Sequence, residues 1–66
     1  MPIGFATFRK NNVFLVRDGF NSVAAAEAAI AECVRDGVVA ENATVTIFET
    51  DEEDGMTIDE VTYQLG

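Results

Sequence analysis

Residues 22–37 read SVAAAEAAIAECVRDG and decide the fold, because they contain the strongest helical pattern of this 66-residue chain. The apolar side chains recur three or four residues apart on one face, at Val23, Ala26, Ile30, Cys33 and Val34. Asn21 and Ser22 are good N-cap residues. Gly37 follows Asp36 as the glycine that a left-handed C-terminal cap prefers. The pattern predicts a helix over about 22–36.

The segment before this helix predicts a β-hairpin. Residues 3–8 alternate between two fairly apolar faces, as a strand does, and the polar residues 9–12 supply a turn. Residues 13–17 are a continuous β-branched and aromatic segment that ends at Asp18 and Gly19. We therefore expect two strands joined by a turn, and the apolar content of the second strand suits a central position in the sheet.

Two further strands are expected after the helix. In residues 43–48 the apolar Val45 and Ile47 alternate with threonines, as in a half-buried strand. In residues 61–65 the apolar Val61, Tyr63 and Leu65 alternate with polar residues. Met56 and Ile58 extend this last strand only if a bulge near residues 59–60 shifts the register. Residues 57–60 also fit a helical capping box, which leaves a C-terminal helix as the alternative. The favoured order is β-β-α-β-β.

This order predicts a small α+β fold, in which one helix packs on one face of an antiparallel sheet. We expect residues 1–66 to form a single domain near the lower size limit for a hydrophobic core, and 48% apolar residues argue against a disordered acidic tail. The single cysteine, Cys33, is expected in the core without a disulfide. Because the helix is rich in alanine, the phenylalanines are expected to supply much of the core: Phe5, Phe8, Phe14, Phe20 and Phe48.

The negative charge of the chain is concentrated at its C-terminal end. Residues 1–40 contain four basic and four acidic residues, whereas residues 41–66 contain eight acidic residues and no basic one. The densest stretch, 49–54, has five carboxylates in six residues and precedes the turn glycine Gly55. Such a segment presents an anionic surface to a partner if a fold positions it.

Calcium binding and catalysis both fit the acidic stretch poorly. With Gly55 at the sixth position of an EF-hand loop, Val61 would stand where the loop needs a bidentate glutamate. Weak binding of divalent cations stays open. The chain has no histidine, which excludes a zinc site of the usual Cys/His kind, and its only serine is a predicted helix cap. We therefore expect a non-enzymatic protein without a cofactor.

The acidic surface could instead take the place of nucleic acid in a basic groove. Five charges over an extended stretch of about 20 Å, at roughly 3.3 Å per residue, come close to the linear charge density of one DNA strand. Glu41, Asp59 and Glu60 would flank this ridge. The partner would be a basic nucleic-acid-binding protein, and direct binding of nucleic acid is disfavoured by the charge. The predicted partner-binding residues are Glu49, Asp51, Glu52, Glu53, Asp54, Asp59 and Glu60.

The alternative is a small interaction module or adaptor that binds through an apolar sheet edge, with the acidic stretch only a solvated face. Segregation of the charge argues against a purely solvating role, because a surface adapted for solubility should carry carboxylates on all elements. A monomer or weak dimer is expected. No basic segment leads a long apolar stretch, so neither a signal peptide nor a membrane span is predicted, and a cytoplasmic location is expected.

In its size, its acidity and its lack of catalytic residues the chain resembles the small phage-encoded inhibitors of host defence, notably anti-CRISPR proteins and DNA-mimic anti-restriction proteins. The resemblance is one of type, since these inhibitors share no single fold and no motif is matched residue by residue. It implies an inhibitor that binds a Cas subunit or a nuclease where that protein accepts target DNA. It also implies action in the cytoplasm of a bacterial host.

Overall fold

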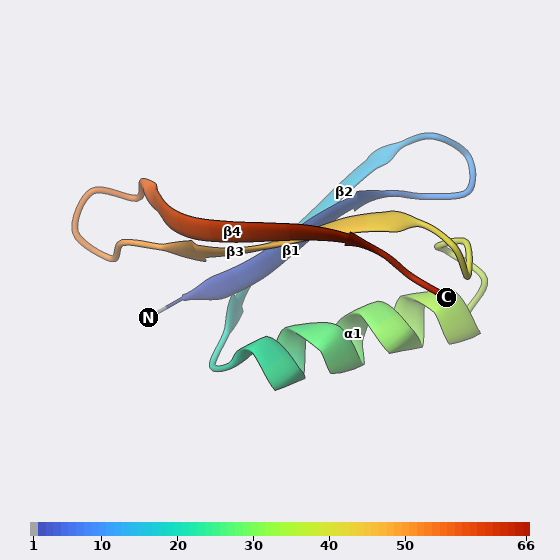
Figure 1. Ribbon diagram of the computed structural model, residues 1–66, viewed down its shortest axis with the longest axis horizontal. Coiled ribbons are helices and arrows are strands. Elements are labelled where there is room, and N and C mark those ends of the chain that lie inside the picture. Colours follow the sequence, from blue (N-terminus) through green and yellow to red (C-terminus); the bar gives the residue numbers. More distant parts are fainter. Residues whose placement is uncertain (1) are drawn as a thin grey trace.

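The computed structural model describes residues 2–66, which form four strands and one helix. The elements are β1 (Ile3–Phe8), β2 (Phe14–Phe20), α1 (Val23–Arg35), β3 (Thr44–Thr50) and β4 (Thr57–Gln64). The strands form one antiparallel sheet in the order β2-β1-β3-β4, and α1 lies on one face of it (Figure 1). The predicted α+β class and the β-β-α-β-β order are confirmed.

Helix α1 begins and ends within one residue of the predicted bounds. The Ser22 Oγ accepts a hydrogen bond of 3.1 Å from the backbone N–H of Ala25, as an N-cap should. At the other end Gly37 has a φ of +78°, the left-handed conformation that glycine adopts most easily. The helix buries the small and branched side chains of Ala26, Ile30 and Cys33 against the sheet.

The second strand differs from its prediction in length and in position. Asp18 and Gly19 do not end β2 but form an irregularity inside it, with Gly19 at a φ of +86°, and the strand continues to Phe20, which pairs with Ile3. The predicted central position is wrong. β2 is an edge strand because β1 pairs with β3 on its other side, where the Thr7 hydroxyl also donates to the Thr44 carbonyl at 2.8 Å.

The last two strands form a hairpin, so the alternative of a C-terminal helix is wrong. β3 extends two residues beyond the predicted end, through Glu49 and Thr50. The register of β4 shifts between the pairs Glu49–Asp59 and Thr50–Thr57, which leaves Ile58 as an extra residue. The bulge that the C-terminal pattern required is therefore present, immediately before residues 59–60.

The core lies between α1 and the inner strands. Phe5 is fully buried and stacks on Phe20 with ring centroids 5.9 Å apart. The expectation that Phe8 and Phe14 belong to the core is wrong, because they are 56% and 57% exposed. Their rings contact each other, with centroids 5.1 Å apart, on the face that α1 does not cover. The buried core cluster comprises Phe5, Leu15, Ile30, Cys33, Val39, Val45 and Ile47.

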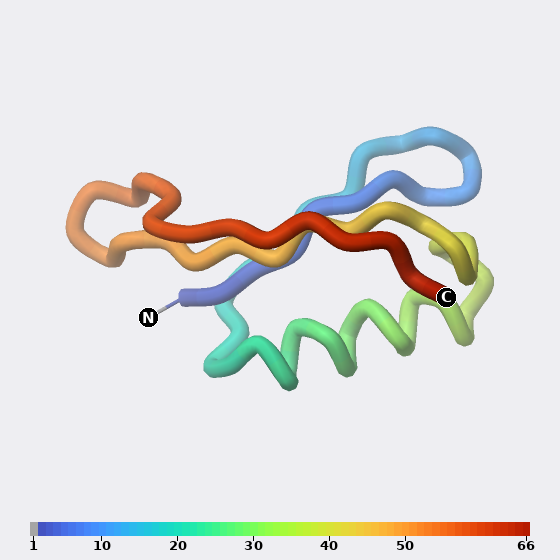
Figure 2. Tube along the Cα trace, viewed as in Figure 1, coloured from blue at the N-terminus to red at the C-terminus, as the bar shows by residue number. Residues whose placement is uncertain are grey.

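The molecule is elongated, with extents of 34 × 20 × 16 Å. The β3–β4 turn projects beyond the N-terminal end of α1, and the β1–β2 turn lies at the opposite end (Figure 2). The backbone N–H of Lys10 donates to the Val38 carbonyl at 2.9 Å, which ties the β1–β2 turn to the segment after α1. The two turns therefore mark two separate ends of the domain.

Candidate functional site: the acidic end

The β3–β4 turn is shaped by the side chains of two aspartates. The Asp51 Oδ1 accepts from the Glu53 N–H at 2.8 Å, and the Asp54 Oδ1 accepts from the Met56 N–H at 2.9 Å. The backbone closes the turn, because the Gly55 N–H donates to the Asp51 carbonyl at 2.9 Å. Asp51 and Asp54 thus bend the chain and still present negative charge, since an ionised carboxylate can accept several hydrogen bonds.

This turn corrects the prediction of an extended acidic ridge. Glu49 lies in β3, whereas residues 51–54 leave the strand and fold into the turn. The charges therefore do not follow one another at strand spacing over about 20 Å. They form a compact cluster at the tip of the hairpin, and a match to the phosphate spacing of a single DNA strand does not follow from residues 49–54.

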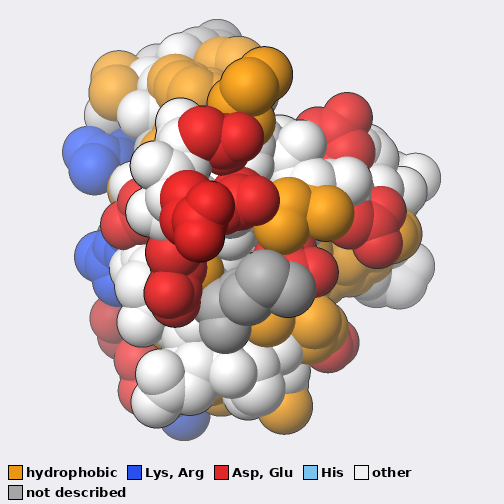
Figure 3. Space-filling model, turned by 90° about the vertical axis from the view of Figure 1, so that its left-hand side faces the viewer, with side chains coloured by type: hydrophobic (Ala, Val, Ile, Leu, Met, Phe, Trp, Pro, Cys, Tyr) orange, Lys and Arg blue, Asp and Glu red, His pale blue; other side chains and the backbone are white. Residues whose placement is uncertain are grey.

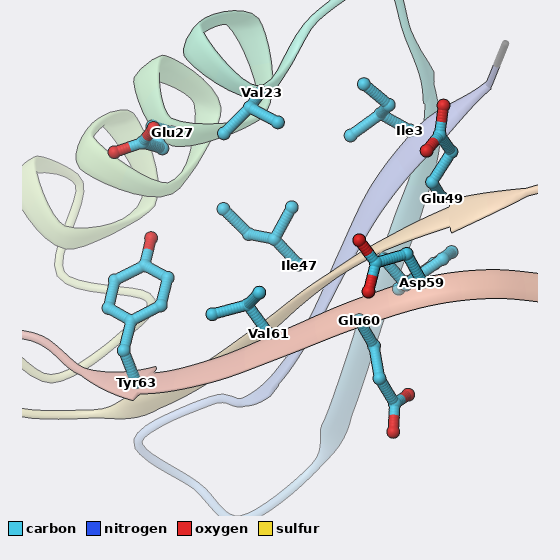
Figure 4. Close-up of a pocket in the computed structure, with 10 residues that line it drawn as sticks. Ile3, Val23, Glu27, Ile47, Glu49, Asp59, Glu60, Val61 and Tyr63 are labelled. Atoms are coloured by element: carbon cyan, nitrogen blue, oxygen red, sulfur yellow. The ribbon is translucent and has the colours of Figure 1, made fainter.

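Strand pairing brings further carboxylates to the same end. Glu49 and Asp59 are directly opposite each other in the β3–β4 ladder, on the face of the sheet that carries α1. Like charges at such a cross-strand pair destabilise a sheet. Glu60 pairs with Phe48 and points to the other face (Figure 4). The sheet therefore carries carboxylates on both of its faces at this end.

Basic side chains lie elsewhere in the molecule. Arg9 and Lys10 belong to the β1–β2 turn, Arg35 ends α1, and Arg17 lies on the distant edge strand β2. Within residues 2–66 the one ion pair joins Arg35 to Glu32 at 3.8 Å, away from the acidic end. Viewed from this end, carboxylates gather across the surface and the basic side chains lie at its margin (Figure 3).

All seven predicted partner-binding residues are brought together by the hairpin, and we call them the acidic end: Glu49, Asp51, Glu52, Glu53, Asp54, Asp59 and Glu60. Glu41 does not flank them as expected, because it precedes β3 and so lies at the opposite end of that strand. The surface suits the ammonium and guanidinium groups of a partner, which form charge-assisted hydrogen bonds with carboxylates.

No group of three or more carboxylate, histidine or cysteine side chains in residues 2–66 is arranged to bind a metal ion. Over the same residues, no helix has the length and apolar character to cross a membrane.

A groove beside the acidic end was missed at the level of sequence. It lies between α1 and β4, has a volume of about 250 Å³, and includes Glu27, Val61 and Tyr63 (Figure 4). Burial, and after it the nearby Glu27 carboxylate, raise the pKa of Tyr63 above its ordinary value of 10.0. The available signal was Glu27 itself, which interrupts the apolar helix stripe between Val23 and Ile30.

Comparison with protein-family models, with curated proteins and with solved structures gives no match for this chain.

Proposed function

We propose that this protein is a non-enzymatic inhibitor that occupies the basic nucleic-acid-binding groove of a partner protein. The observation that supports this proposal is the acidic end, where seven carboxylates converge and the described residues place no basic side chain among them. The partner would be a nucleic-acid-binding protein of host defence, such as a Cas subunit or a nuclease.

Both faces of the hairpin carry negative charge. A groove that binds nucleic acid presents lysine and arginine side chains to the phosphates on its ligand. The acidic end presents carboxylates on a projecting hairpin, with Asp59 on one face of the sheet and Glu60 on the other. Repulsion between Glu49 and Asp59 would be relieved by cations of the partner, which favours binding over leaving this end in solvent.

A second candidate function is an adaptor that binds through apolar surface. The specific observation in its favour is the exposed ring pair of Phe8 and Phe14 on the uncovered sheet face, beside Val16 of the edge strand β2. Such a contact would depend on apolar area and would respond weakly to salt.

The test is capture of partners from a nuclease-treated bacterial lysate on the immobilised protein, followed by elution with duplex DNA or with salt. If the protein competes with nucleic acid, added DNA should release the partner from it, and the binding of the partner should weaken steeply as the salt concentration rises. A partner that stays on the immobilised protein during both elutions would contradict the proposal and favour the adaptor.

A pair of charge-matched variants makes the test specific to the acidic end. The tip variant carries Glu52→Gln, Glu53→Gln and Asp54→Asn, and the control carries Glu32→Gln, Asp36→Asn and Glu41→Gln. Each variant changes the net charge from −8 to −5, because three carboxylates are neutralised. We expect loss of capture with the tip variant and retention with the control. Equal losses would show that only the overall charge matters, and the proposed site would then be wrong.

A further inference from the structure

We propose that the groove between α1 and β4 binds a basic amphipathic helix of a partner protein. This inference goes beyond the proposed function, because the acidic end alone could compete with nucleic acid. The groove would instead select a partner segment by its shape and its apolar face. It is open to solvent along one side of α1, where Val23 and Val61 are 47% and 61% exposed.

The groove follows α1 for most of its length. A second hollow of about 290 Å³ continues the first one, and both are lined by Glu27 and Tyr63. From Val23 to Val34 the lining extends over twelve helical residues, or about 16 Å at a rise of 1.5 Å per residue. The helix contributes one stripe of side chains to this lining: Val23, Glu27, Ile30, Ala31 and Val34.

The width of the sheet leaves room for a second helix. Four strands with a spacing of about 4.8 Å cover roughly 19 Å of sheet, and one helix with its side chains covers about 10 Å, so roughly half of this width stays uncovered. The backbone of α1 approaches chiefly β1 and β2. β4 has no fully buried residue and presents Val61 and Tyr63 toward the groove, and Leu65 follows them just after the strand ends. A helix beside α1 would cover these side chains.

The charge of the lining specifies a basic occupant. Glu27 lies midway along the groove, while Glu49 and Asp59 lie together near its end at Val23 (Figure 4). None of the lining residues is basic. A second copy of this chain is disfavoured as the occupant, because its net charge of −8 repels another copy. The fitting segment has leucine-like residues at helical spacing, flanked by lysine or arginine.

The probe is a synthetic 14-residue peptide of leucine and lysine, with leucines at positions i, i+3, i+4 and i+7 and no aromatic residue. Its isomer alternates leucine and lysine, as a strand would. Tyr63 is the single tyrosine of a chain without tryptophan, so its fluorescence reports on the groove directly. Backbone amide NMR shifts of the protein then locate the bound peptide.

We expect the helical peptide to bind at least about tenfold more tightly than the alternating isomer, a difference of about 1.4 kcal/mol. Equal or tighter binding of the isomer would overturn the helix in favour of strand addition to the edge of β4. Amide shifts confined to residues 51–56, outside the groove, would overturn the groove as the site.

Matched variants test the groove itself. Val61→Asp should weaken binding about tenfold or more, because it places an unpaired charge under the apolar face of the peptide. Val16→Asp, on the opposite edge strand and of similar exposure, should change it less than about twofold. Glu27→Gln should weaken binding a few fold, and Glu32→Gln on the same helix should not. Unchanged binding by Val61→Asp and Glu27→Gln would overturn the proposal.

Discussion

The two edge strands of this sheet differ in what lies over them. β2 contacts α1 and buries Leu15, which is 5% exposed. β4 is one residue longer, yet it has no fully buried side chain, and Val61 at its centre is 61% exposed. One helix on a four-stranded sheet therefore stabilises one edge and leaves the other edge available for contacts with a partner.

The two edge strands also differ in the charge that they carry. β4 carries Asp59 and Glu60, and its turn to β3 carries further carboxylates, whereas β2 carries one base and one acid, Arg17 and Asp18. Charged residues on an exposed edge also oppose pairing with another copy, which is how natural proteins protect long edge strands from aggregation. The open edge is thus protected against self-association while it stays accessible to a basic partner.

The largest expected effect compares aliphatic truncations in the two edge strands. Leu15→Ala should lower the free energy of unfolding by about 2–5 kcal/mol, because it leaves a cavity in the core. Val61→Ala should change it by no more than about 0.5 kcal/mol. A 66-residue domain has a total stability of roughly 3–10 kcal/mol, so Leu15→Ala should remove a large share of it.

Urea denaturation followed by circular dichroism measures both variants. Similar losses at Leu15 and Val61 would contradict the division between a stabilising edge and an open one. The comparison also requires that Val61→Ala retain the wild-type dependence of the unfolding free energy on urea, since that slope reports the surface exposed on unfolding.

A smaller effect on stability is expected from substitutions at the contacts that join β2 to β1 and β4 to β3. A Cβ at Gly4 would lie 2.5 Å from the Arg17 carbonyl oxygen of β2 and 2.6 Å from the Phe48 ring. Gly4→Ala should therefore lower the free energy of unfolding by about 1–3 kcal/mol, because the added methyl group overpacks this site. Thr62→Ala removes a solvent-exposed hydrogen bond of 2.8 Å between Thr62 of β4 and Thr46 of β3 and should cost about 0.5 kcal/mol.

Thermal unfolding at one pH measures this second pair. In a Phe48→Ala background, Gly4→Ala should still lower the melting temperature, because the Arg17 carbonyl belongs to the backbone and cannot move aside like a side chain. An unchanged melting temperature for Gly4→Ala would show that β2 can shift away from β1, and its edge would then be no more firmly attached than that of β4.

Local patterns were sufficient to predict most of the fold. The helix was predictable because its apolar period, its Ser22 cap and its Gly37 stop all agree, and that consistency is typical of a well-specified element. The place of β2 was not predictable, because which strand pairs with the far side of β1 is decided by contacts between distant residues. Phe8 and Phe14 were misplaced for a related reason: alternation assigns residues to two faces, but only the packed structure shows which face the helix covers.

The candidate site was predictable in its residues but not in its shape. The seven carboxylates are close in sequence, so any hairpin through this segment would bring them together. Their compact form depends on Asp51 and Asp54 accepting backbone hydrogen bonds in the turn, which a count of charges does not reveal. The groove depends on where α1 lies across the sheet, and Glu27 gains its relation to Tyr63 only through that placement.

The smallest expected effect is the electrostatic influence of Glu27 on the pKa of Tyr63 inside the groove. Burial, and then the Glu27 carboxylate, raise the pKa of Tyr63, so Glu27→Gln should lower that pKa part of the way toward 10.0. Glu32→Gln, whose carboxylate lies near Arg35 and outside the groove lining, should leave it unchanged. Absorbance of tyrosinate near 295 nm measures the titration without interference, because the chain has one tyrosine and no tryptophan.

The same shift predicts how stability responds to alkaline pH. Because the pKa of Tyr63 is higher in the folded protein than its ordinary value of 10.0, the folded state holds this proton more tightly than the unfolded state does. The contribution of Tyr63 to stability is therefore fully present below that ordinary value and is lost as the pH rises through the folded pKa. Tyr63→Phe should remove this loss, and Glu27→Gln should reduce it. If neither variant alters the loss of stability at alkaline pH, then β4 is too far from α1 for the helix to influence this edge of the sheet. The groove between α1 and β4 would then be too wide to bind a helix by contact with both walls.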